Sequence, residues 1–111
     1  MIGLNERQIK NKLVSYIGFA KKSRNIIFGA DKILETYKKG VIIVSKAISN
    51  NTLNKLSNHI IKTSSILHTI SDELMVDIVG SDRIKVFQVL DKNLEGAMMT
   101  SLKNLEDATL E

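Results

Sequence analysis

The segment Val41-Ile-Ile-Val-Ser45 constrains the fold more than any other part of the chain. Its first four residues are all β-branched and apolar, a composition typical of strands. A strand with one face in water alternates apolar and polar residues, whereas this segment is apolar on both of its faces. We therefore predict a central β-strand that is covered by other structure on both sides.

Helical patterns precede this strand. Apolar residues recur at intervals of three to four from Ile9 to Ala20, behind Asn5, which is a favourable N-cap residue. This spacing predicts a helix that runs to about residue 22. A second, shorter helix is predicted from Gly29 to Gly40, with Gly40 as its C-terminal stop. Its buried side would be formed by Ile33, Leu34 and Tyr37.

The rest of the chain continues the alternation. Strands are predicted at residues 65–70 and 84–90, and residues 26–28 form either a short strand or an extended connection. Further helices are predicted after Ser49 or Asn51, from Ser71 to a stop at Gly80, and after Asp91, with a frayed tail at residues 107–111. Helices that alternate with short strands imply an α/β fold in which a small sheet lies between helical layers.

Length and composition exclude several classes of protein. The 111 residues suffice for one hydrophobic core, so residues 1–111 are expected to form a single domain. The absence of cysteine excludes disulfides, thiolate metal sites and cysteine nucleophiles. No apolar run approaches the roughly 18 residues of a membrane helix. Charged residues stand near the N-terminus where a signal peptide is apolar. We expect a cytoplasmic protein without a membrane partner.

Positive charge is concentrated in the first part of the chain. Residues 1–46 contain ten basic and three acidic residues, a net charge of +7, whereas residues 47–111 have a net charge of −3. A basic half is the usual footprint of a protein that binds a phosphate backbone, although lysine-rich solvated helix faces are the alternative. Gly29 would let a foreign backbone approach, and the helix start behind it would direct N–H groups at phosphate. The sequence thus predicts a nucleic-acid contact at Gly29.

Residue patterns typical of catalysis are missing. His59 and His68 have no second ligand at metal-binding spacing, so both are interpreted as structural or surface residues. Asp72, Glu73 and Asp91 stand at helix starts, where carboxylates cap and stabilise the helix. There is no phosphate-binding glycine loop and no serine in a glycine-flanked elbow. We expect no catalytic residue, no metal, no cofactor and no small-molecule substrate.

The run Tyr16-Ile-Gly-Phe-Ala-Lys-Lys-Ser-Arg-Asn-Ile-Ile-Phe-Gly29 resembles the opening of the ribosomal "L seven Ae / L thirty e" superfamily, and in particular its bacterial YlxQ-like branch. The similarity continues in order over about residues 8–104, through Val41-Ile-Ile-Val, Ser49-Asn-Asn-Thr-Leu, Ser71-Asp-Glu-Leu, Gly80 and Val89-Leu-Asp-Lys. The resemblance implies a three-layer α-β-α sandwich with a small mixed sheet. It also implies binding of ribosomal or other structured RNA, typically a kink-turn.

The resemblance further implies how RNA is contacted. In the family, the glycine before the second helix approaches the RNA backbone, and Asn-Glu-x-x-Lys on that helix reads bases and phosphates. This chain keeps the glycine as Gly29 but carries Asp31, Lys32 and Glu35 at the three reading positions. An ionised aspartate only accepts hydrogen bonds, whereas asparagine also donates them. The location of the contact is therefore expected to be kept, and standard kink-turn readout to be altered.

A second loop completes the predicted interface. Residues 80–84 correspond to the family's second RNA-contacting loop, where Arg83 would contact phosphate and Ile84 would either pack on a base or begin the core of a strand. Arg24 stands where the family pattern has glycine, and Lys46 stands where acidic residues are common. The residues predicted to contact RNA are Lys21, Lys22, Arg24, Gly29, Ala30, Asp31, Lys32, Glu35, Lys46, Arg83 and Ile84.

These observations favour a non-catalytic RNA-binding protein. One alternative is a protein–protein interaction adaptor on the same fold, because the altered residues at positions 31, 32 and 35 would not impair such a role. A second alternative is an enzyme whose site has no recognisable pattern.

Overall fold

The computed structural model describes the backbone of residues 5–110 and the side chains of residues 5–106. Within these residues the chain forms four strands, β1 (Ile26–Phe28), β2 (Val41–Ser45), β3 (Ile66–Ile70) and β4 (Val86–Val89). Five helices alternate with them, α1 (Glu6–Lys22), α2 (Ala30–Glu35), α3 (Asn50–Thr63), α4 (Asp72–Val79) and α5 (Lys92–Leu110). The order of elements predicted from the sequence is confirmed.

The strands form one mixed sheet in the order β1-β4-β2-β3. Strand β2 pairs in parallel with β3 and antiparallel with β4, and β4 pairs antiparallel with β1. All five residues of β2 are buried. Ile42 and Val44 pack on one side of the sheet, and Val41 and Ile43 on the other. The prediction of a central strand covered on both faces is confirmed.

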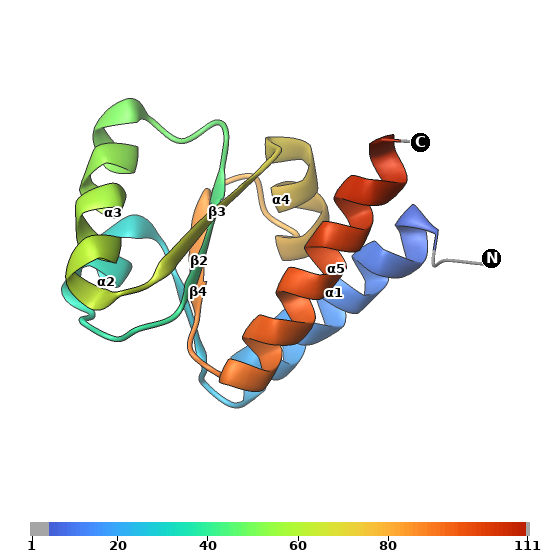
Figure 1. Cartoon of the computed structure of the whole chain (residues 1–111), viewed down its shortest axis with the longest axis horizontal. Coiled ribbons are helices and arrows are strands. Elements are labelled where there is room, and N and C mark those ends of the chain that lie inside the picture. The colour runs from blue at the N-terminus through green and yellow to red at the C-terminus, as the bar shows by residue number, and fades with distance from the viewer. Residues whose placement is uncertain (1–4, 111) are drawn as a thin grey trace.

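Helices cover both faces of this sheet, and the three layers are visible in Figure 1. Helices α2 and α3 lie on one face, and α1, α4 and α5 lie on the other. The protein is therefore an α/β fold with a three-layer α-β-α arrangement, as predicted.

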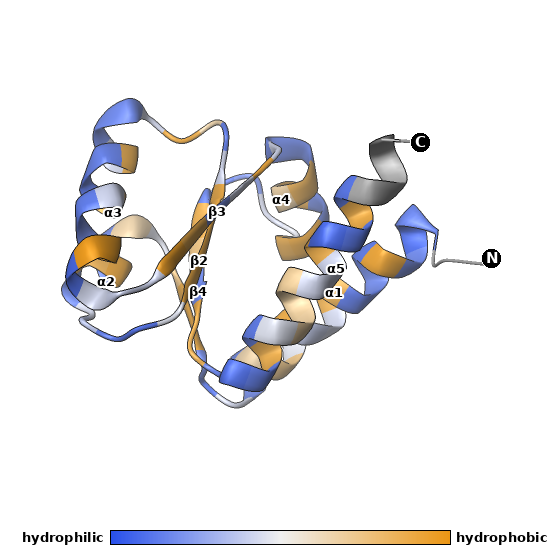
Figure 2. Cartoon of the chain, in the orientation of Figure 1, coloured by the Kyte–Doolittle hydropathy of each residue, from blue (hydrophilic) through white to orange (hydrophobic). Residues whose placement is uncertain are grey.

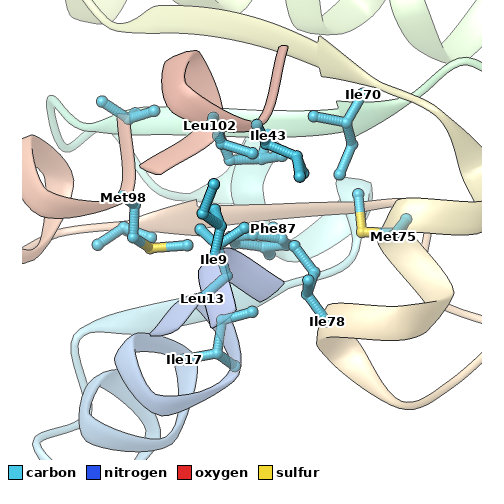
Figure 3. Packing of buried hydrophobic residues seen from close by; sticks show 13 residues of the cluster. Ile9, Leu13, Ile17, Ile43, Ile70, Met75, Ile78, Phe87, Met98 and Leu102 are labelled. Atoms are coloured by element: carbon cyan, nitrogen blue, oxygen red, sulfur yellow. The ribbon is translucent and has the colours of Figure 1, made fainter. Parts of the chain in front are cut away.

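One apolar cluster on each face of the sheet makes up the core. In the larger cluster, Ile43 and Phe87 of the sheet pack with Ile9 and Leu13 of α1 and with Leu102 of α5 (Figure 3). The smaller cluster packs β2 and β4 against α2 and α3. In Figure 2 the strands β2 and β4 are coloured as apolar, whereas much of α3 is hydrophilic. Both faces of the sheet are thus closed by buried side chains.

Helix α1 follows its prediction closely. The Asn5 side chain accepts a hydrogen bond from the Gln8 N–H at 2.9 Å, and the Gln8 side chain accepts one from the Asn5 N–H at 3.1 Å. This reciprocal capping box fixes the helix start. The predicted stripe from Ile9 to Ala20 is buried.

The helix predicted from Gly29 to Gly40 is wrong in its second half. Helix α2 ends at Glu35, and Thr36 is already extended, with φ −103° and ψ 121°. Tyr37, predicted to be buried, is 73% exposed. The remaining residues up to Gly40 form a segment without helix or strand that leads into β2.

Contacts with β4 hold the segment between α2 and β2 in place. The Gln88 side chain is fully buried, and its Nε2 donates to the carbonyl oxygen of Lys38 at 3.0 Å. A Cβ at Gly40 would overlap the carbonyl oxygen of Val89. Gly40 is therefore needed for close packing of two backbones, and its predicted role as a helix stop is wrong.

Two further boundaries differ from the predictions. Strand β4 begins at Val86, so Ile84 lies in the preceding loop and is half-buried. Helix α5 continues to Leu110, so the backbone of most of the tail predicted to fray is assigned to the helix. Glu111 lies outside the described residues.

Candidate nucleic-acid interface

Three chain segments meet around a hollow at the end of the sheet where β2 leads into α3. The first segment joins β1 to α2, the second follows β2 and enters α3, and the third precedes β4. The hollow, which we call the Gly29 groove, is lined by Phe28, Gly29, Ala30, Ala47, Ile48, Ser49, Thr52, Arg83, Ile84, Lys85 and Val86. Both loops that were predicted to contact RNA therefore contribute to one surface.

The backbone of Gly29 explains why glycine stands in this groove. Its φ of 94° lies in the left-handed region, which favours glycine. The Gly29 N–H donates to the carbonyl oxygen of Val86 at 3.0 Å, so the turn is tied to β4. No other atom lies within 4 Å of the point where a Cβ would stand. This side of the turn is open to a ligand.

The predicted contribution of a helix dipole does not hold. Helix α2 has six residues, fewer than two turns, and Gly29 provides no side-chain cap. Such a short helix has little macrodipole with which to attract an anion. The groove offers phosphate an open backbone and the side chains around it instead.

A polar network behind the groove holds its walls in place. The Ser45 hydroxyl donates to Asp72 Oδ1 at 2.7 Å, and the Ala47 N–H donates to the Ser45 oxygen at 3.0 Å. Lys85 Nζ donates to the same Asp72 oxygen at 2.9 Å. The bonds from Lys85 and then Ser45 hold the pKa of Asp72 below its ordinary value. Two cations, Arg83 and Lys85, line the groove. Lys85 is paired with Asp72, whereas the Arg83 guanidinium has no ion pair with a described side chain.

Sequence reasoning missed this network. Asp72 stands in the first turn of α4, as predicted for a carboxylate that stabilises a helix start, while Ser71 is the N-cap and accepts from the Leu74 N–H at 3.1 Å. The partners Ser45 and Lys85 come from β2 and from the loop before β4, and no spacing in the sequence links them to Asp72.

The structure brings together part of the predicted set of RNA contacts. Gly29, Ala30, Arg83 and Ile84 line the groove. The ammonium of Lys21 lies 5.5 Å from the centroid of the Phe28 ring, which is also part of the groove lining.

The predicted reading positions lie beside the groove. Asp31, Lys32 and Glu35 are exposed on α2, and they do not line the groove. Lys32 and Glu35, three residues apart on this helix, form no ion pair with each other or with another described side chain.

The other predicted basic residues lie elsewhere. Lys46 lines a different hollow, together with Glu6 and Lys10, on the α1 side of the sheet. Lys22 and Arg24 precede β1, at the other end of this three-residue strand from Gly29, and neither lines the groove.

The histidines have protein neighbours. His59 is buried on α3, and its ring centroid lies 5.7 Å from that of Tyr37. His68 Nε2 lies 3.1 Å from Glu106 Oε1. Across the part of the chain with described side chains, no group of three or more histidine, aspartate or glutamate residues is placed to hold a metal ion. None of the helices within residues 5–110 is both long and apolar enough to cross a bilayer.

Comparison with known proteins bears on the fold. No protein-family model and no curated protein sequence matches the chain. The structure is similar to that of a protein with unknown function from Bacillus halodurans, with a TM-score of 0.69 over 83% of this chain and 97% of that chain. Sequence identity is 16%, so the likeness concerns the arrangement of the backbone.

Proposed function

We propose that the protein binds structured RNA through the Gly29 groove, as a non-catalytic member of the superfamily that its sequence resembles. The carrying observation is that Gly29 and Ala30 line one hollow with Arg83 and Ile84, which come from a loop far away in the sequence. The sequence predicts RNA contacts in both of these segments.

The chemistry of the groove supports this proposal. The open Gly29 backbone permits close approach of a sugar–phosphate chain. Arg83 provides an exposed guanidinium, which suits phosphate geometry. Ile84 provides an apolar surface on which an unstacked base can lie, because it is outside β4 and only half-buried. The groove thus combines a backbone that a sugar–phosphate chain can approach, a cation and an apolar surface, which together suit a distorted RNA element.

The exposed residues of α2 bear on specificity. Asp31 and Glu35 place carboxylates beside the groove, where they repel phosphate, while Lys32 attracts it. We expect recognition to depend on the shape of the RNA backbone more than on the standard pattern of base contacts.

The test compares two labelled RNAs, a kink-turn RNA and a straight duplex of equal length, by fluorescence anisotropy over a range of salt concentrations. We expect the wild type to prefer the kink-turn RNA. The double variant Arg83→Ala, Ile84→Ala should lose this preference, and its log–log salt slope should fall by about one unit for the lost phosphate contact. Lys103→Ala removes an exposed cation from α5, away from the groove, and is the matched control.

Two outcomes would contradict the proposal. One is equal affinity of the groove variant and the wild type for the kink-turn RNA. The other is capture of a protein partner from lysate that survives ribonuclease digestion and is lost in the groove variant, which would favour the adaptor.

A further inference from the structure

The end of the sheet opposite the Gly29 groove is built from four neighbouring chain turns. Here the Leu90 N–H donates to the carbonyl oxygen of Asn25 at 2.9 Å, which joins the end of β4 to the start of β1. The Gly40 N–H donates to the Ser65 hydroxyl at 3.2 Å, which joins the starts of β2 and β3. In Figure 1 this is the lower end of the sheet, where α1 ends and α5 begins.

Exposed cations surround this row of turns and define a surface that we call the basic end. Its members are Lys22, Arg24, Lys38, Lys39, Lys62 and Lys92. None of the six makes an ion pair with a described side chain. Figure 2 shows hydrophilic residues along the same lower edge.

Two carboxylates at this end are engaged by backbone groups. Asp91 accepts the N–H groups of Asn93 at 2.8 Å and of Leu94 at 3.1 Å. Glu95 Oε1 accepts the Val41 N–H at 3.3 Å. The basic end therefore keeps a positive field that these acids do not cancel through direct pairing.

Arg24 is held at this corner against its backbone preference. Its φ of 60° lies in the left-handed region, and Ser64 is the other non-glycine residue with positive φ among the described residues. Glycine adopts this conformation without strain, whereas a residue with a Cβ is disfavoured there. This conformation ends α1, because it lets the Asn25 N–H donate to the carbonyl oxygen of Ala20 at 2.8 Å. The arginine side chain itself is exposed at this corner.

The width of this surface suits a short nucleic-acid segment. Neighbouring strands of a sheet lie about 4.8 Å apart, so the four turns span about 14 Å. Each strand of a duplex carries one phosphate per about 3.4 Å of helix axis, so a surface of this width faces several phosphates. Tyr37, next to Lys38, adds an exposed ring on which a base can stack. Insertion into a membrane would need an amphipathic helix lying flat, and this surface is made of helix ends and turns.

We propose that the basic end is a second nucleic-acid surface, which binds the phosphates of an RNA segment without reading its sequence. The assignment of RNA as the ligand rests on the proposed function, but the surface is separate from the Gly29 groove. The first test uses the straight RNA duplex and the variant Lys22→Ala, Lys39→Ala, Lys62→Ala. Loss of three phosphate contacts should lower the log–log salt slope by about two to three units. An unchanged slope overturns the proposal.

Arg24 provides a sharper test, because Ser64 offers a matched control. Arg24→Gly and Ser64→Gly both relieve positive-φ strain, so both should raise Tm by about 2–4 °C. Only Arg24→Gly removes a cation, and it should weaken duplex binding about threefold to tenfold. A stabilised Arg24→Gly variant that binds the duplex as tightly as the wild type would show that the arginine has no part in binding.

The outcomes separate the two surfaces. Loss of kink-turn preference in the groove variant with unchanged duplex affinity supports both proposals, whereas duplex binding without any kink-turn preference removes the groove proposal alone. Vesicles of phosphatidylserine serve as a competing anionic surface. Tighter binding of the wild type to these vesicles than to the duplex would overturn the assignment to nucleic acid.

Discussion

Contacts with residues far away in the sequence explain why particular residue types stand at certain positions of this protein. Gly40 is an example. Because α2 already ends at Glu35, Gly40 is not needed to stop a helix, and its neighbours Lys39 and Val41 do not explain it either. The reason is the carbonyl oxygen of Val89, which lies where a Cβ would stand. Gln88, on the same strand, holds the segment before Gly40 through the Lys38 carbonyl.

Gly40→Ala is therefore expected to destabilise the fold. The new methyl group meets backbone, which cannot rotate away as a side chain can, so β2 and β4 would have to separate. We expect the free energy of unfolding to fall by about 2 kcal/mol in urea denaturation. Gly96→Ala on α5 is the control, since a Cβ there has no neighbour within 4 Å and alanine favours a helix by about 1 kcal/mol. Equal stability of Gly40→Ala and the wild type would contradict the packing role.

At the scale of secondary-structure elements, prediction from sequence succeeded where the signal was local. Both ends of helix α1 were predicted, because its signals are local: Asn5 is the N-cap, and the stripe from Ile9 to Ala20 belongs to the helix itself. Strand β2 was predicted because its first four residues are β-branched and apolar, and the structure buries the whole strand.

Prediction failed where an element is shaped by a distant partner. The segment that follows α2 is held by Gln88 of β4 through the carbonyl oxygen of Lys38, a contact that no local pattern indicates. For the candidate site, the residues Gly29, Ala30, Arg83 and Ile84 were identified, but the contribution of Ala47–Ser49 was not. The turn after β2 joins the groove through pairing of β2 with β4, which leaves no local pattern in the sequence.

The network of Ser45, Asp72 and Lys85 ties three elements together, and its stability should depend on pH. The pKa of Asp72 is lowered in the folded protein, so its charged form stabilises the fold above the ordinary pKa and this contribution is lost as the pH falls through the folded-state value. Asp72→Asn should therefore lower Tm at pH 7, and the difference from the wild type should shrink below about pH 4. Thermal melts across this range measure the effect.

Asp82→Asn is the matched control for this prediction. Its carboxylate is exposed and has no ion pair or hydrogen bond among the described side chains, so the substitution should leave Tm nearly unchanged at every pH. A Tm difference for Asp72→Asn that is as large at pH 3 as at pH 7 would show that the ionised carboxylate is not the stabilising species.

For the whole molecule, the charge asymmetry of the sequence does not become a basic half in space. Helix α1, from the basic part of the chain, packs beside α5, from the acidic part (Figure 1). Arg83, from the acidic part of the chain, lies at the groove, whereas Arg24, from the basic part, lies at the basic end. The sum over a stretch of sequence cannot show this, because consecutive elements run back and forth between the ends.

If the Gly29 groove and the basic end both bind RNA as proposed, the protein can bridge two RNA segments. Strand β2 spans about 13 Å between the ends, so two RNAs bound there lie close enough for energy transfer between attached dyes. At low salt, a donor-labelled kink-turn RNA and an acceptor-labelled duplex should show energy transfer in the presence of the wild type. The transfer should be much weaker with the groove variant or with the triple variant Lys22→Ala, Lys39→Ala, Lys62→Ala. Excess protein should abolish the transfer, because each RNA then binds its own copy of the protein. If each RNA binds alone but the two never bind together, they compete for one surface. The proposal that the Gly29 groove and the basic end bind RNA independently would then be wrong.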